Sequence, residues 1–580
     1  GALDGCFLWV WDGSTFLTLV RAAKLEKGGA EGSTWSDGDC YLVLDTVARL
    51  QAHRPDEYMK GRIDTWIPII AKVQREDGLV DSWTILGEFD ATHGKPWRWQ
   101  IKKGEAFRGA LHYNTGSLYA FAATLQRATG DGRVLAIADR AVRQFMKGGA
   151  VAGPMHWAVP HLYSRTGDAG LLDALRRASG QNSVFGPPLR DAPEIFGHNT
   201  QAAHTLLREA AFCGLTGDDG VLSALRRLAT NQLTRKTFVT GAVAPIHRGR
   251  RPEQTVGGKS YPGADYNEAV GPAYELPNDT CYCESCGQCL FTEWYYRMFR
   301  LTGEAMYMDA VERALYNTVP GCVALDRPDF FYCNPQEQMS GSHRSHTNGP
   351  ESKWEAHYTW RRQYTKKAAC CPPKVMRALA MSVEMAYSAN RDGLWVNLYG
   401  DNATRLALPD GGAVEIRQST AYPWDGRIKL VLPKVEGAKP FGLFLRIPGW
   451  VENPARVAVN GQPLPDRPAA GAYHRIDRAW KSGDIVDLDL PMPVRILAAH
   501  PNVADARGKV AVARGPVVYC IEGDDLPSGT AIEQVRVPAT ADLKPVATRE
   551  LGGVVKLAGA LTCAGGEAPA PDRLVVDERD

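Results

Sequence analysis

Apolar residues recur at the three-and-four spacing of amphipathic helices between about residues 37 and 390. One phrase of this kind occurs four times, in stretches that begin at Ala128, Arg165, Leu215 and Leu301. Each copy contains Thr-Gly-Asp or Thr-Gly-Glu, which is typical of the end of one helix, followed by an apolar stripe with Arg on its outer side. Because the copies are irregularly spaced, we expect an (α/α)6-type toroid, or barrel, with inserts on one face rather than a solenoid.

After about residue 390 the pattern changes to short runs in which apolar and polar residues alternate. Turn signals such as Asn460-Gly461 separate the runs at intervals typical of antiparallel sheets. We therefore expect a multidomain α plus β protein. Its four segments are an N-terminal segment (1–36), a helical catalytic barrel (37–390), a β-sandwich (391–525), and a small additional β segment with the C-terminal tail (526–580).

Composition narrows the choice of partners. The chain has 580 residues, too many for one compact core, and its 67 Lys and Arg nearly balance its 65 Asp and Glu. This balance gives no overall attraction to nucleic acid or to an anionic membrane, and no apolar run reaches the roughly 20 residues that span a bilayer. We expect no nucleic-acid or membrane partner, and a neutral ligand such as a sugar fits well.

The cysteines indicate thiols rather than disulfides. There are 13, an odd number, and they concentrate at 281–289 and 370–371 instead of spreading evenly as in small disulfide scaffolds. Reduced thiols favour a cytoplasmic location. The chain begins with Gly1 instead of Met, so a periplasmic or secreted location after loss of a signal peptide stays an alternative. A homodimer that pairs through the β-sandwich is also left open.

Acidic residues and cysteines are most concentrated in the segment NEAVGPAYELPNDTCYCESCGQC, which starts at Asn267. A second cysteine motif, AACCPPK, follows about 80 residues later. Glu284, Cys286, Cys370 and Cys371 offer one oxygen and three thiolates, a sufficient tetrahedral set for Zn²⁺. The two prolines after Cys371 stiffen the turn. Adjacent cysteines form a disulfide only with strain, so a pair of metal ligands is the better interpretation.

Other interpretations of these cysteines stay open. A structural zinc site is at least as common as a catalytic one in a cysteine-rich patch, and Cys283, Cys286 and Cys289 also have the spacing of a finger or a redox pair. The redox interpretation is weak, because no βαβ pattern surrounds CGQC, which opens a helix. Cys281, Cys283 and Cys289 are additional candidates for binding the metal.

The longest insert, from about 240 to 280, favours glycosidic chemistry. It is rich in Gly, Pro, Tyr and Asn, and a loop that continues to Glu284 carries Glu268, Glu275 and Asp279 beside three tyrosines. Glycoside hydrolysis needs one group that protonates the leaving oxygen and another that attacks or activates water. For any single carboxylate, a solvated loop position or a helix cap is an equally good interpretation.

An ordered set of motifs resembles glycoside hydrolase family 127, the β-L-arabinofuranosidase family. The motifs are Glu268-Ala269, Leu276-Pro277-Asn278-Asp279, Tyr282-x-Glu284-Ser285-Cys286, Glu312 to Asn317, Phe331-Tyr332-x-Asn334-Pro335 and Cys370-Cys371-Pro372-Pro373. Shorter matches continue into the β-rich part, for example Leu445-Arg446-Ile447-Pro448. The resemblance covers most of the chain and implies an enzyme that acts on an oligosaccharide or another glycoside.

The resemblance also implies roles. Zinc is held by Glu284, Cys286, Cys370 and Cys371, with Cys370 as nucleophile and Glu268 as general acid/base of a retaining hydrolase. The residues assigned to substrate binding are Glu312, Tyr332, His156 and His198. A surface ion pair for Glu312, core packing for Tyr332 and ordinary loop positions for both histidines are the alternatives.

One stretch departs from the family pattern. Where family members often carry His-Glu-Leu-Tyr ahead of Gly-His, residues 111–117 read LHYNTGS. The sugar can therefore differ from L-arabinofuranose, and another furanose or a branched acidic pentose is the alternative. A lyase or an epimerase on the same helical fold, and a non-catalytic carbohydrate-binding protein with structural zinc, are the competing functions.

Overall fold

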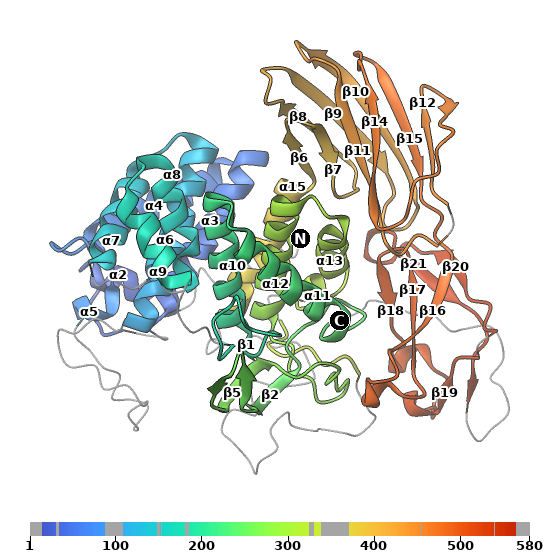
Figure 1. Ribbon diagram of the computed structural model, residues 1–580, viewed down its shortest axis with the longest axis horizontal. Coiled ribbons are helices and arrows are strands. Elements are labelled where there is room, and N and C mark those ends of the chain that lie inside the picture. The colour runs from blue at the N-terminus through green and yellow to red at the C-terminus, as the bar shows by residue number, and fades with distance from the viewer. Residues whose placement is uncertain are drawn as a thin grey trace.

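The computed structural model describes residues 14–30, 34–86, 108–147, 151, 153–179, 185–323, 330–337, 370–452, 454–538 and 540–563. Parts of the expected N-terminal segment (1–13) and C-terminal tail (564–580) lie outside these residues. The described chain has a helical N-terminal part and a β-rich C-terminal part (Figure 1). The change comes between α15 (Cys371–Met385) and β6 (Tyr387–Asn390), and this arrangement confirms the mixed, multidomain fold class.

The helical part contains α15 and the following elements: α2 (Ser14–Ala22), α3 (Ser36–His53), α4 (Glu57–Val73), α5 (Ser82–Leu86), α6 (Arg108–Thr129), α7 (Arg133–Met146), the 3-10 helix η2 (Gly153–Trp157), α8 (Val159–Thr166), α9 (Ala169–Ser179), α10 (Asn199–Thr216), α11 (Asp219–Arg235), α12 (Ser285–Thr302), α13 (Ala305–Tyr316) and α14 (Thr318–Gly321). Among the described residues, no helix is both long and apolar enough to cross a bilayer.

The repeated Thr-Gly phrase ends helices as predicted. Helices α8, α10 and α12 each stop at a threonine, and the next residue is Gly167, Gly217 or Gly303 with a left-handed backbone. In each case the glycine N–H donates to a carbonyl of the last helical turn, a conformation that glycine adopts without a steric penalty. The following helix then buries its apolar stripe, which makes each phrase a helical hairpin.

Helices α3, α6, α12 and α15 hold the part of the core that matters for the site. Helix α3 packs against α6 and α15, and α12 packs against α10, α13 and α15. Their apolar faces belong to a single buried cluster that extends through the helical part. The packing brings the first turns of α12 and α15, which are about 85 residues apart in the chain, next to each other.

A small sheet lies at one end of the helical part, at the bottom of Figure 1. Its strands, in the order β1-β5-β2, are β1 (Gly197–His198), β5 (Ala264–Val270) and β2 (Ile246–Arg251). A hairpin of β3 (Gln254–Val256) and β4 (Lys259–Tyr261) extends from it. This sheet occupies the predicted insert at 240–280 and pairs β5 with the residues that precede α10.

The β-rich part begins with two larger sheets. The first has the order β13-β12-β15-β10-β9-β8, and the second has the order β14-β11-β7-β6. Their remaining bounds are β7 (Gly393–Val396), β8 (Asn402–Ala407), β9 (Ala413–Thr420), β10 (Arg427–Glu436), β11 (Phe441–Ile447), β12 (Arg456–Val459), β13 (Gln462–Pro463), β14 (Ala472–Arg478) and β15 (Asp484–Asp489). The pairing is antiparallel, as expected, except that β7 runs parallel to β11.

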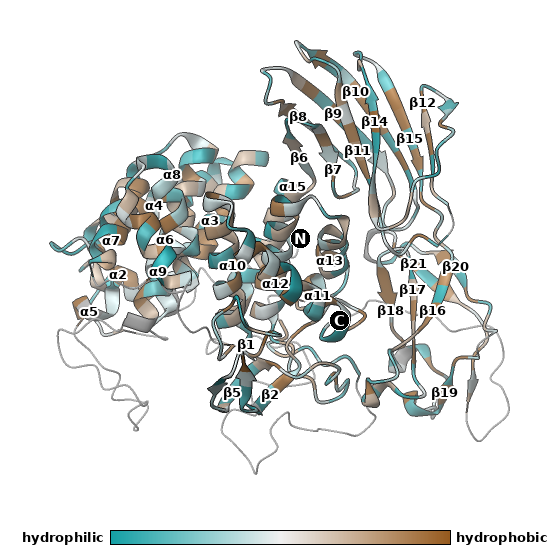
Figure 2. Cartoon of the chain, viewed as in Figure 1, coloured by the Kyte–Doolittle hydropathy of each residue, from teal (hydrophilic) through white to brown (hydrophobic). Residues whose placement is uncertain are grey.

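Alternation along these strands explains their packing. Strand β9, for example, buries Val414, Ile416 and Gln418 and turns the residues between them outward. The alternation is visible as brown and teal bands on the strands (Figure 2). Buried residues of both sheets form one hydrophobic cluster, so the two sheets share a core.

The last described segment has short sheets of its own. They contain β16 (Val494–Ala498), β17 (Val510–Arg514), β18 (Val517–Tyr519), β19 (Val535–Arg536), β20 (Lys544–Ala547), β21 (Val555–Ala558) and β22 (Thr562–Cys563). A separate small core of Leu543, Leu557 and Leu561 lies beneath them. The segment also reaches back to the helical part, where Asn317 hydrogen-bonds Pro516 and Val518.

Candidate active site

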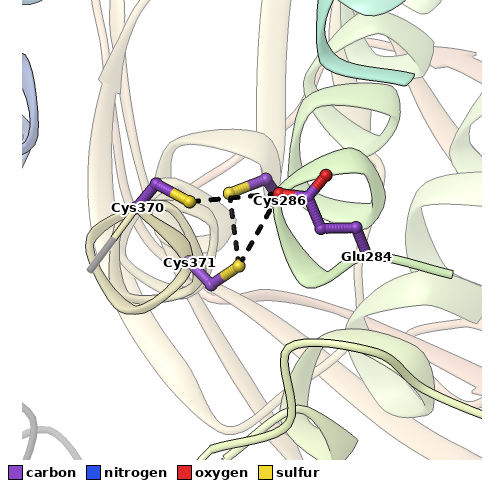
Figure 3. A group of neighbouring side chains, drawn as sticks. All are labelled: Glu284, Cys286, Cys370 and Cys371. Atoms are coloured by element: carbon purple, nitrogen blue, oxygen red, sulfur yellow. Dashed lines mark hydrogen bonds between the residues drawn. The ribbon is translucent and has the colours of Figure 1, made fainter. Parts of the chain in front are cut away.

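Four predicted ligand side chains point toward one another where α12 and α15 begin (Figure 3). The ligand atoms of Glu284, Cys286, Cys370 and Cys371 all lie within 4.8 Å of one another. The Sγ atoms of Cys286 and Cys371 are 3.4 Å apart, and Glu284 Oε1 is 4.0 Å from Cys370 Sγ and 3.9 Å from Cys371 Sγ. The sequence prediction that these four residues come together is therefore supported by geometry.

The two helix starts fix these side chains. Glu284 is the N-cap residue of α12 and Cys286 follows in the first turn, while Cys370 caps α15 and Cys371 is its first residue. Prolines fit the first turn of a helix because the N–H they lack has no partner there in any case. The positive end of each helix dipole lies beside the thiols, which favours their ionised form.

Charge is poorly balanced in this cluster. Burial raises the pKa of Glu284 to about 8, with further increases from the charges of Glu268 and Cys370. Burial also raises the pKa of the Cys286 and Cys371 thiols. The pKa of Cys370 is lowered because the Cys286 and Cys371 thiols donate hydrogen bonds to its sulfur. These contacts thus favour the ionised form of one sulfur, and four ionised ligands would need an added positive charge.

The donor set fits a metal ion. A tetrahedral zinc ion about 2.3 Å from sulfur and about 2.1 Å from oxygen would separate its ligand atoms by about 3.6 to 3.8 Å. The separations of 3.4, 3.9 and 4.0 Å in the cluster are close to these values. Three thiols and one carboxylate also suit a borderline-soft divalent cation. The cluster can therefore hold a metal ion.

Glu268 lies beside this cluster and pairs with His198. The two residues come from neighbouring strands, where His198 of β1 is paired with Ala269 of β5. His198 Nε2 is 3.0 Å from Glu268 Oε2, and this contact together with the charges of Glu284 and Cys370 raises the pKa of His198 despite burial. The structure thus brings two further predicted site residues to the cluster.

The backbone around Glu268 is strained. Glu268, Tyr274 and Cys283 have φ values of 52°, 67° and 43°, a left-handed region that residues other than glycine rarely adopt. Each such residue costs on the order of 1 kcal/mol or more, and such strain concentrates at functional sites. Here all three residues lie in the loop that leads from Glu268 to Glu284. The strain therefore falls on the segment that joins the two carboxyl groups of the site.

Tyr332 also belongs to the site. Its hydroxyl donates a hydrogen bond to the Cys370 sulfur, which helps to lower the pKa of that thiol. Its backbone carbonyl accepts from the N–H of Ser285, and its ring meets that of Tyr282 edge-on at 6.1 Å. His247 stacks on the Tyr282 ring, with ring centroids 5.0 Å apart. Tyr332 is therefore placed by the residues that start α12.

Two residues next to the cluster were not predicted from the sequence. Asn199 donates from Nδ2 to Glu284 Oε2 at 3.0 Å, and Lys374 Nζ lies 3.3 Å from the Cys370 carbonyl oxygen. Each had a local signal, because Asn199 follows His198 directly and Lys374 follows Cys370 by one helical turn. Residues i and i+4 share a helix face, so a lysine at that spacing was a recognisable candidate.

The structure places Glu312 elsewhere. We expected it near the sugar, but it is buried on α13, and its carboxylate accepts hydrogen bonds from Arg446, from the Tyr422 hydroxyl and from Trp450 Nε1. Arg446 lies on β11 and also pairs with Asp309 at 2.6 Å. These contacts join the helical part to the first β-rich segment. The surface ion pair considered for Glu312 is not found either, because both partners are buried.

His156 and the additional cysteines contact other groups. His156 Nε2 is 3.1 Å from His204 Nδ1, and both rings meet Trp157 edge-on. The Cys281 thiol donates to the carbonyl of Asn278. Among the described residues, the metal-ligand cluster contains none of the cysteines 281, 283 and 289, which were left open as ligands.

The chain matches known protein families over most of its length. Residues 14–383 match the family description "Beta-L-arabinofuranosidase, GH127 catalytic domain". Residues 393–492 match the middle domain of the same family, and residues 494–561 match its C-terminal domain. The catalytic-domain match covers more than half of the chain and includes the whole cluster described above.

Individual relatives agree with the family match. The chain is 26% identical over 553 residues to a non-reducing end β-L-arabinofuranosidase of Bifidobacterium longum subsp. longum, which spans 86% of this chain and 77% of the relative. A GH127 β-L-arabinofuranosidase from Geobacillus stearothermophilus T6 has a similar structure, with a TM-score of 0.81, 27% identity and coverage of 99% of this chain and 91% of the other. A second GH127 β-arabinofuranosidase structure has a TM-score of 0.81, 26% identity and coverage of 99% and 90%. The chain therefore belongs to glycoside hydrolase family 127 and is a glycosidase.

Proposed function

We propose that the protein is a zinc-dependent retaining glycosidase that removes terminal β-L-arabinofuranosyl residues, with Cys370 as nucleophile and Glu268 as general acid/base. The observation that carries the proposal is the convergence of Glu284, Cys286, Cys370 and Cys371, with the Glu268–His198 pair beside them. Cys370 is the most accessible of the four ligands, since the other three are buried. This partial exposure favours Cys370 over the two other cysteines as the nucleophile.

The same four residues would hold the zinc ion. When bound, zinc supplies positive charge that keeps the Cys370 sulfur ionised at neutral pH and orients it. The chain contributes the remaining control of this sulfur. Tyr332 donates a hydrogen bond to it, and the start of α15 fixes its direction.

In the first half of the reaction, the Cys370 thiolate attacks the anomeric carbon of the terminal sugar. A carbon–sulfur bond forms while the glycosidic carbon–oxygen bond breaks, and protonated Glu268 gives its proton to the departing oxygen, which leaves as an alcohol. His198 holds the Glu268 carboxyl at 3.0 Å and directs it. The product of this step is a thioglycosyl enzyme with an ionised Glu268.

In the second half, Glu268 removes a proton from water, and the resulting hydroxide oxygen attacks the same carbon. The carbon–sulfur bond breaks and its electron pair returns to Cys370, which regenerates both residues. Each half inverts the anomeric configuration, so the product retains that of the substrate.

The sugar is inferred from relatives. The similar proteins are named as β-L-arabinofuranosidases, and the identity of 26–27% supports the same substrate class for this chain. The alternative is another furanose or a branched acidic pentose, since the stretch Leu111 to Ser117 differs from the pattern common in the family. A panel of aryl furanosides and pyranosides distinguishes these sugars by relative kcat/KM.

Replacement of the nucleophile tests the mechanism. Cys370→Ala is expected to lower kcat on a chromogenic β-L-arabinofuranoside by on the order of 10⁴-fold or more, because no other group can take over the covalent step. The matched control is Cys520→Ala, which removes an exposed thiol in the C-terminal segment and should leave the rate unchanged. Equal turnover by wild type and Cys370→Ala would show that the thiolate mechanism is wrong.

Two further measurements separate this mechanism from structural zinc. NMR of the first product formed should show the β anomer. Zinc analysis should give one ion per chain in the wild type, and Cys370→Ser should lose activity while its thermal unfolding changes little. Loss of the folded structure in Cys370→Ser would instead indicate a purely structural zinc site.

The proposal also includes the domain architecture, the cellular location and the oligomeric state of the protein. The hairpins of the helical part support an (α/α)6-type toroid over 37–390, and the shared core of the two larger sheets supports a β-sandwich over 391–525, followed by the segment 526–580. We also propose a cytoplasmic protein, which suits the free thiols, with an envelope or secreted location and a homodimer through the sandwich as alternatives. Cell fractionation and light scattering test these points.

A further inference from the structure

The proposed metal centre leaves a charge to be explained. A carboxylate and three thiolates carry four negative charges, of which a divalent cation neutralises two. Glu284, Cys286 and Cys371 are buried, so water screens the remaining charge poorly. A buried net charge of this size requires a positive group nearby.

Lys374 is a buried lysine one turn along α15 from Cys370. Its side chain is 6% exposed, and Nζ donates to the Tyr113 hydroxyl at 2.8 Å and to the Cys370 carbonyl oxygen at 3.3 Å. Its charge interacts with the sulfurs of Cys286 and Cys370. The ammonium group therefore lies against the cluster, although no ligand atom hydrogen-bonds it directly.

Other cations near the cluster are already paired. Arg377, the next basic residue on the same face of α15, donates to Glu293 and to Asp45. His198 pairs with Glu268. Lys374 also faces a carboxylate, that of Asp39, but their separation of 3.8 Å is longer than the 2.5 to 3.0 Å between Arg377 or His198 and their carboxylates. Lys374 is thus the cation whose charge is least committed to another protein group.

We infer that Lys374 is a positioning residue that supplies the counter-charge of the metal–thiolate centre, and that Tyr113 and Asp39 orient it. The inference rests on the proposed function, because it presupposes the metal. It assigns the Tyr113 hydroxyl a bridging position, since this group accepts from Lys374 and donates to Asp39 at 2.6 Å.

The packing of Tyr113 supports a built arrangement. A Cβ atom at Gly38 would lie 2.6 Å from the Tyr113 ring, so only glycine lets α3 approach α6 this closely. Asn114 then ties the two helices, accepting from the Gly38 N–H and donating to the Thr34 carbonyl. The Tyr113 ring, and with it the hydroxyl that holds Lys374, has little freedom to move.

Zinc affinity tests the inference. Lys374→Met retains the length of the side chain without its charge, and in a competition of Zn²⁺ between the protein and a chromophoric chelator it should bind zinc about 10- to 100-fold more weakly than wild type. Lys374→Arg, which restores the charge, should recover most of the affinity. The matched control is Lys556→Met, because Lys556 is a buried, ion-paired lysine in the C-terminal segment, and its loss should leave zinc affinity unchanged.

A second variant covers the case in which Lys374→Met does not fold. Tyr113→Phe keeps the ammonium charge but removes its bridge to Asp39, and it should weaken zinc binding by a smaller factor, about 3- to 10-fold. Wild-type zinc affinity in folded Lys374→Met, or in Tyr113→Phe if the former fails to fold, overturns the inference even if thermal stability falls. Failure of the proposed function looks different, since then wild type itself binds no stoichiometric zinc or cleaves no furanoside.

Discussion

Glu284 and Glu312, two of the buried glutamates in the helical hairpin of α12 and α13, have opposite surroundings. Glu284, at the start of α12, is 2% exposed, and Glu312, on α13, is 1% exposed. Glu312 faces Arg446, which is itself completely buried, and also accepts from Tyr422 and Trp450. Glu284 accepts from the Asn199 amide and faces thiols.

The difference shows how a buried carboxylate can be stabilised. Arg446 provides the Glu312 cluster with a positive charge from within the chain, so that cluster is complete and serves to join two parts of the protein. Burial raises the pKa of Glu284 to about 8, which means that the fully ionised form of its cluster is energetically unfavourable. A cluster that lacks a sufficient cation of its own is the one suited to an external ion, which agrees with the proposed zinc site.

The largest expected effect comes from replacing one glutamate in each cluster by glutamine. Glu312→Gln leaves Arg446 buried with only Asp309 to balance it, so the free energy of unfolding in urea should fall by about 3 kcal/mol, with zinc content and KM unchanged. Glu284→Gln should instead lose most of the bound zinc and the activity, with a smaller change in the stability of the metal-free protein. A raised KM at wild-type stability in Glu312→Gln would restore the sugar-binding role that the sequence suggested.

Much of the fold was visible in the sequence because local signals agreed with the tertiary structure. The Thr-Gly ends of α8, α10 and α12 and the alternation in β9 are short-range patterns that the structure reproduces. The parallel pairing of β7 with β11 had no such signal. It depends on contacts between strands almost 50 residues apart, which no local pattern specifies.

The metal-ligand residues could be predicted because their sequence motifs are unusual. A Glu-x-Cys and a Cys-Cys pair are unusual, and the structure brings all four side chains together. The contacts of Glu312 could not be predicted, because a glutamate on a helix has many ordinary partners, and its partner Arg446 lies over 130 residues away. Lys374 was not predicted because its position depends on contacts with Tyr113 and Asp39, which are distant in the sequence.

A pair of buried histidines makes the stability of the fold depend on pH. His156 and His204 face each other, and burial lowers the pKa of both, that of His204 to about 3. In the unfolded chain these histidines take up protons below about pH 6.5, while the folded chain resists protonation, so stability is lost as pH falls below 6.5. Each histidine contributes a slope of at most about 1.4 kcal/mol per pH unit.

Replacement of one histidine measures this slope. His204→Gln should flatten the dependence of unfolding free energy on pH between about 6.5 and 5 by the share of one group, compared with wild type at the same zinc content. The matched control is His53→Gln, which changes an exposed histidine at the end of α3 and should leave the wild-type profile. Parallel profiles for wild type and His204→Gln would mean that the pair is already protonated in the folded protein.

The smallest expected effect concerns a junction without charges. Asn317, which caps α13, donates from Nδ2 to the Pro516 carbonyl at 2.9 Å and accepts at Oδ1 from the Val518 N–H at 2.8 Å. Neutral hydrogen bonds of this kind each contribute about 1 kcal/mol, so Asn317→Ala should lower the free energy of unfolding by about 1 to 2 kcal/mol, less than Glu312→Gln. Exposed Asn502 is the matched position, where alanine should change stability by less than about 0.5 kcal/mol. If Asn317→Ala proved as damaging as Glu312→Gln, charge would not be what distinguishes the two junctions, and the contrast between complete and incomplete buried clusters would lose its basis.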